Sequence, residues 1–129
     1  MMTGLWLSLW LGAFGAQEIA DETEYRERMH EIDHSFATLR NRGAREYSRI
    51  EAEAAKLSEL FREVEAFWRG RGDEELAGYA RLAKDGADEA RNAAMRKEEK
   101  GLEAAIETIA RSCEGCHREP LDKYRVPRD

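Results

Sequence analysis

The residues best suited to chemistry in this 129-residue chain lie near its C-terminus. Cys113, Cys116 and His117 form a C-x-x-C-H motif that uses both cysteines of the chain. On a helix, positions i, i+3 and i+4 share one face, so the two thiols and the imidazole would point the same way. Two such thiols can add to the two vinyl groups of a haem while the imidazole ligates its iron. The motif therefore predicts one covalently attached haem c, with iron bound by His117.

Three other chemistries use a pair of cysteines at this spacing. A dithiol redox pair belongs beside a βαβ pattern, and no such pattern surrounds this motif. A closed zinc site needs four ligands, and the chain has no further cysteine to supply them. An isolated disulfide in an exported protein is the third alternative. Haem attachment is the favoured interpretation.

Four amphipathic segments must position this motif, each with large apolar residues at alternating steps of three and four. The first begins at Asp21, where Glu24 completes a capping box, and ends at Gly43. The second carries its stripe over 47–68 and is broken by the glycines at 70 and 72. The third begins at Asp73 and has a stripe of small residues, which allows a neighbouring helix to approach closely. After a break at 96–101, the fourth runs over 102–119 and is stopped by Pro120.

Stripes that repeat every 3.5 residues, joined by short breaks, predict an all-α fold: an up-down-up-down antiparallel four-helix bundle with a left-handed twist. The rival architecture is an extended coiled-coil hairpin. Segments of some 20 residues separated by short breaks favour the bundle.

The first 16 residues carry no charge, and they contain the only strongly apolar run, at 5–11, which reaches about 12 residues with 12–16. This run is shorter than the ~20 residues needed to cross a bilayer, and small residues follow it. It is interpreted as a signal peptide over 1–16, cleaved near Gly15 or Ala16, which predicts a periplasmic domain over 17–129 without stable membrane insertion. An uncleaved anchor or a misassigned start codon are the alternatives. The net charge of −6 favours redox partners with a basic patch and gives no support to nucleic-acid binding.

Taken together, the chain resembles the class II c-type cytochromes, the cytochrome c′ family. The resemblance rests on four helices and on a single C-x-x-C-H at the end of the last one. It implies a haem packed inside the bundle, with His117 as proximal ligand, and it makes a homodimer possible. One departure concerns the aromatic–Arg pair that often follows the haem histidine: Pro120 and Leu121 stand there, and Tyr124-Arg125 comes later.

The ligand on the distal side of the iron, opposite His117, distinguishes between the functions of such proteins. In an antiparallel bundle, Met29 on the first segment lies near the level of His117, whereas Phe36 lies about 10 Å deeper. A thioether is a good soft ligand for haem iron, and low-spin members of the family look similar here. We therefore predict Met29 as distal ligand of an electron carrier. The alternatives are a five-coordinate protein that binds NO or CO beneath an open or merely blocked site, and ligation by His30 or His34.

Two further features receive simpler interpretations. His30 and His34 have the i, i+4 spacing of a surface metal site, but acidic neighbours favour a solvated face. Arg26 precedes Met29 by three residues and could pair with a haem propionate. No nucleophile–base pattern, phosphate loop or second metal cluster predicts an enzyme.

Overall fold

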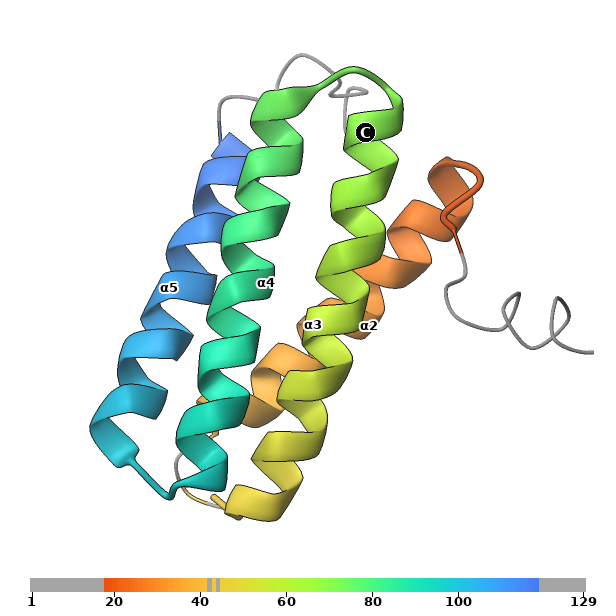
Figure 1. Ribbon diagram of the computed structural model, residues 1–129. Helices are drawn as coiled ribbons and strands as arrows, with labels where there is room; N and C mark the ends of the chain where they lie inside the picture. The colour runs from red at the N-terminus through yellow and green to blue at the C-terminus, as the bar shows by residue number, and fades with distance from the viewer. Residues whose placement is uncertain (1–17, 42, 44, 119–129) are drawn as a thin grey trace, which may run out of the picture.

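The computed structural model describes residues 18–41, 43 and 45–118, and within them it forms four α-helices and no strand. They are α2 (Glu22–Arg40), α3 (Tyr47–Gly70), α4 (Glu74–Met95) and α5 (Glu99–Arg118). Helices α3, α4 and α5 lie side by side and alternate in direction, while α2 crosses behind α3 (Figure 1). The predicted all-α four-helix bundle is confirmed. The signal peptide predicted at 1–16 and the residues from 119 onward lie outside the described part of the chain.

Two aspartates begin their helices as the sequence predicted. The Asp21 carboxylate accepts a hydrogen bond from the Glu24 N–H at 2.9 Å, and the Glu24 carboxylate accepts one from the Ala20 N–H at 2.8 Å. The box thus closes one residue earlier than the usual form, in which the N-cap N–H is the donor. At α4, the Asp73 carboxylate accepts from the Leu76 N–H at 3.0 Å. Both caps satisfy backbone donors that a helix leaves unpaired.

The helix ends differ slightly from the sequence prediction. Helix α2 ends at Arg40 rather than Gly43, because Asn41 is already extended (φ −79°, ψ 95°). The α3–α4 turn has Gly72 at φ 79°, where glycine pays no steric cost. The α4–α5 break is narrower than the predicted 96–101, since Lys97 reverses the chain at φ 56° and α5 has begun by Glu99.

Helix α4 lies at the centre of the packing, with α3 on one side and α5 on the other. Its small residues make that position possible. A Cβ at Gly86 would lie 2.9 Å from Cγ1 of Ile109 and 3.4 Å from the backbone oxygen of Ala105. The alanines of the predicted stripe are all buried: Ala80, Ala83, Ala87, Ala90 and Ala94.

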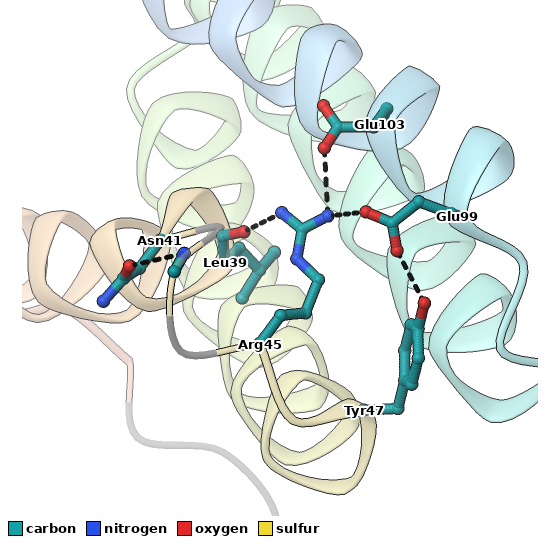
Figure 2. Close-up of polar contacts among 7 residues, drawn as sticks. Leu39, Asn41, Arg45, Tyr47, Glu99 and Glu103 are labelled. Carbon is teal, nitrogen blue, oxygen red and sulfur yellow. Dashed lines mark hydrogen bonds and ion pairs between the residues drawn. The ribbon is translucent and has the colours of Figure 1, made fainter.

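Helices α2 and α5 have little direct contact, and one arginine connects their lower ends. The guanidinium of Arg45 donates to the backbone oxygen of Leu39 at 3.0 Å and to Glu103 at 2.9 Å, and it also pairs with Glu99 (Figure 2). The hydroxyl of Tyr47 donates to the second oxygen of Glu99 at 2.6 Å. The Arg45 side chain is 8% exposed, whereas Glu99 and Glu103 are 50% and 32% exposed, so only the arginine side of this connection is shielded from water. Above it, a cavity lies between the two helices.

Candidate functional site

A cavity of about 660 Å³ lies between α2 and α5, with α3 and α4 behind it. That volume is within the ~300–1,000 Å³ typical of sites for small molecules and cofactors. The back of the cavity is apolar and charged side chains stand at its edges, which suits a flat, largely apolar ligand with polar groups on its rim. The apolar lining comes from all four helices: Ile32, Phe36, Phe61, Val64, Ala80, Ala83 and Ala110.

The C-x-x-C-H motif forms one wall of this cavity. Helix α5 continues to Arg118, so Cys113, Cys116 and His117 share a helical face as the sequence predicted. All three line the cavity. Cys116 is buried, Cys113 is partly buried, and His117 is exposed at the rim. The motif thus presents two sulfurs and one imidazole to the same space.

Both thiols are strongly biased toward their neutral form. The pKa of Cys113 is raised to about 11, chiefly by burial and then by nearby Asp33, while Arg40 opposes both. Burial, followed by the neighbouring Cys113 and by Asp73, raises the pKa of Cys116 to about 12. Catalytic and redox-active cysteines instead have lowered pKa values, because the thiolate is their reactive form. This environment is unfavourable for a dithiol redox enzyme.

Met29 reaches the same cavity from the opposite helix, as its depth along the chain predicted. Its side chain is partly buried, packs against the core and lines the cavity together with Ile32 and Phe36 one and two turns further on. The cavity therefore has a thioether on α2 and an imidazole on α5. These are two ligand types that haem iron accepts.

The remaining predicted residues lie outside the cavity. Arg26, His30 and His34 are exposed and are not part of its lining. No group of three or more His, Cys, Asp or Glu residues that could hold a metal ion occurs in the described ranges. A propionate contact by Arg26 and a metal contact by the two histidines therefore remain sequence predictions.

Sequence reasoning missed several residues of the cavity. Arg40 and Arg111 stand at its edges, and Tyr79 of α4 enters it. A Cβ at Gly115 would lie only 2.3 Å from Cε1 of Tyr79, so the glycine between the two cysteines makes room for that ring. The glycine inside the motif was the available signal. Its partner could not be inferred, because it lies on another helix.

An aromatic cluster lies beside the motif, where α2 begins and α3 ends. The ring of Tyr25 lies 4.9 Å from that of Phe67 and 5.5 Å from that of Trp68, measured between centroids. The indole N–H of Trp68 donates to the Tyr25 hydroxyl at 3.0 Å. Burial raises the pKa of Tyr25 above its usual range, and the neighbouring Cys116 and Cys113 add to this.

Comparison with known proteins adds no family to these observations. No family model, curated protein or solved structure gives a match to the chain. None of the helices in the described ranges is both long enough and apolar enough to cross a membrane.

Proposed function

We propose that this protein is an exported monohaem c-type cytochrome that carries single electrons and is not an enzyme. The observation that carries the proposal is the composition of one cavity. It gathers the two sulfurs and the imidazole of C-x-x-C-H on α5 and the thioether of Met29 on α2. These are the groups needed to attach a haem covalently and to ligate its iron from both sides.

The residues of the cavity fit such a group. Cys113 and Cys116 would hold it through thioethers, each formed when a thiol adds across a vinyl double bond. His117 would be the proximal ligand and Met29 the distal one. The bound haem would supply one-electron exchange at its iron, whereas the protein supplies ligands, burial and a docking surface. A His/Met ligand pair raises the reduction potential relative to a single histidine.

Surface charge supports a carrier rather than a nucleic-acid-binding protein. The chain has 27 acidic and 21 basic residues, so a redox partner with a basic patch would associate faster at low ionic strength. Export rests on the apolar, uncharged first 16 residues. Because c-type haem would be attached after export, the proposed location of the carrier is the periplasm.

The test is to express the full chain in a host with c-type haem maturation and to measure its mass and optical spectra. The proposal expects one covalent haem and sharp low-spin bands after reduction. A Cys113→Ala/Cys116→Ala variant should contain no covalent haem. A full-length exported chain without haem would refute the proposal.

Replacement of the distal methionine separates an electron carrier from a gas-binding protein. Met29→Leu should lose the weak far-red band typical of a Met–iron bond and should bind carbon monoxide rapidly when reduced. Met95→Leu is the matched control, because Met95 is 55% exposed at the end of α4. If the parent protein already binds carbon monoxide rapidly and stoichiometrically, the five-coordinate NO/CO-binding alternative replaces the carrier. The apolar surroundings of Met29, which include Phe36 and Phe61, are what would favour that alternative.

A further inference from the structure

Tyr79 of α4 meets α5 at the residue between the two cysteines. One edge of its ring occupies the space that a side chain at position 115 would need. A Cβ at Gly115 would lie 2.8 Å from both Cδ1 and Cζ of Tyr79, and closer still to Cε1, so only glycine fits against this ring. Tyr79 also lines the cavity together with Cys113 and Cys116, so the contact belongs to the candidate site itself.

This contact lies on the back of the C-x-x-C-H motif. Successive residues of an α-helix are rotated by about 100°, so Gly115 lies about 160° around the axis of α5 from both Cys113 and His117. Cys113 and His117 line the cavity, and the ring of Tyr79 therefore supports α5 from the opposite side. The last turn of α5 cannot rotate toward α4 unless the ring moves.

A second glycine contact holds the same two helices two turns away. A Cβ at Gly86 of α4 would lie 2.9 Å from Cγ1 of Ile109 of α5. Gly86 follows Tyr79 by seven residues, so both lie on the same face of α4. Each helix thus has a glycine that receives a large side chain of the other helix. Two such contacts at different levels fix both the rotation of α5 and its position along α4.

We propose that Tyr79 is the positioning residue of the C-x-x-C-H motif: its ring, seated on Gly115, fixes the rotation of the last turns of α5 and so directs the sulfurs and the imidazole into the cavity. This inference rests on the function proposed above and adds to it a residue outside the motif. Ligand-bearing side chains keep their geometry only when the element that carries them is itself held in place. The atoms of Tyr79 next to Gly115 are ring carbons, so the role belongs to the ring.

The first measurement uses the reduced, haem-free full chain and follows the alkylation of each cysteine by iodoacetamide at fixed pH. Gly115→Ala should speed the alkylation of Cys116, which is 7% exposed, about tenfold, because the added methyl group forces the end of α5 away from the ring. Adding Tyr79→Leu to this variant removes the clashing ring atoms and should return the rate to that of the parent. Tyr79→Phe alone keeps the ring and should retain the slow rate.

Two controls separate positioning from overall stability. Gly78→Ala makes the same substitution one residue from Tyr79, where no atom lies within 4 Å of the Cβ position, and should not change the rate. Leu57→Ala removes a fully buried side chain of α3 outside the cavity lining, so it shows how much alkylation follows from destabilising the whole bundle. The effect of Gly115→Ala should exceed that of Leu57→Ala.

The second measurement uses the chain with covalently attached haem. Gly115→Ala should lower the fraction of low-spin haem in the optical spectrum, because the imidazole of His117 no longer faces Met29 across the cavity. Adding Tyr79→Leu should restore the low-spin spectrum, and Gly78→Ala should leave it unchanged. A loss of stability alone would not be reversed by removing a second large side chain.

The outcomes separate the two proposals. If Gly115→Ala changes neither alkylation nor the spectrum, or if Tyr79→Leu does not reverse its effects, the inference about Tyr79 is refuted while the proposed function stands. If the exported native chain acquires no covalent haem, the proposed function is refuted and the positioning role of Tyr79 with it, whatever the alkylation rates.

Discussion

The two sides of helix α5 are built in opposite ways. Toward α4, small residues bring the backbones close, and Gly86 lies directly against Ile109. Toward α2, the helices separate, the side chains are larger and a cavity of about 660 Å³ remains. The same helix thus has one face that fixes the fold and one that is left for a ligand.

The tight packing of this fold is therefore concentrated at the interfaces of α4. A bundle in which all four interfaces closed fully would have no room for a cofactor. Here the α4 interfaces provide the rigid part, and Arg45 connects α2 to α5 only at the end away from the motif. A ligand between α2 and α5 would therefore add the contacts that the protein alone lacks, and would stabilise the fold.

The largest expected difference between the two sides comes from truncating one side chain on each. Ile109→Ala, on the closed side, should lower the free energy of unfolding of the haem-free chain by about 3 kcal/mol, because Ile109 is fully buried. Met29→Ala, on the open side, should cost only about 1 kcal/mol, because it enlarges an existing cavity. Urea unfolding measures both values. Equal losses of stability for the two variants would show that both sides of α5 are packed equally tightly.

Added volume should be tolerated at one glycine of α4 and not at another. Gly86→Leu should destabilise the chain by about 2–3 kcal/mol, since even its Cβ would contact Ile109 and the α5 backbone. Gly78 has open space at its Cβ position, so Gly78→Ala should stabilise the chain by about 0.5–1 kcal/mol through higher helix propensity. Thermal unfolding distinguishes the two. If Gly86→Leu did not destabilise the chain, the close approach of α4 and α5 would not be essential.

Replacing Arg45 removes its ion pairs with Glu99 and Glu103 and should loosen the packing of α2 against α5. Arg45→Gln should cost about 2 kcal/mol, because it removes the charge of a side chain that is only 8% exposed and bonds to Leu39, Glu99 and Glu103. Amide exchange should accelerate in α2 more than in α4. Arg111→Gln is the control: its side chain is 77% exposed and its pairing with Glu107 should contribute at most about 0.5 kcal/mol. Uniform acceleration in all helices would show that Arg45 supports the whole bundle instead.

The haem-free chain is also expected to lose stability at high pH. A thiol whose pKa is higher in the folded than in the unfolded chain favours folding while it is neutral. The contribution of Cys113 and Cys116 is therefore complete below about pH 9, their ordinary pKa, and is lost as the pH rises toward 11 and 12. Unfolding measured from pH 8 to 11 should show a decline that a Cys113→Ser/Cys116→Ser variant lacks. Thiolate absorbance that titrates near pH 9 in the folded chain would contradict the assigned burial.

Much of the fold followed from local signals. The 3–4 spacing of apolar residues predicted four helices, and Asp21 and Asp73 marked two of their starts. These features depend on neighbours within one or two helical turns, so they are legible in the sequence. The exact helix ends were predicted less accurately. Helix α2 ends three residues before Gly43 because Asn41 leaves the helix, and Lys97 rather than a glycine adopts the left-handed turn conformation.

The residues of the candidate site likewise fall into those that the sequence predicted and those that it did not. The sequence by itself determined the C-x-x-C-H face of α5 and the level of Met29, because both follow from residue spacing along single helices. Only the tertiary structure decided that Tyr79 would fill the space beside Gly115, and that Arg26 would stay outside the cavity. Such contacts join residues on different helices, and their geometry depends on how the helices pack.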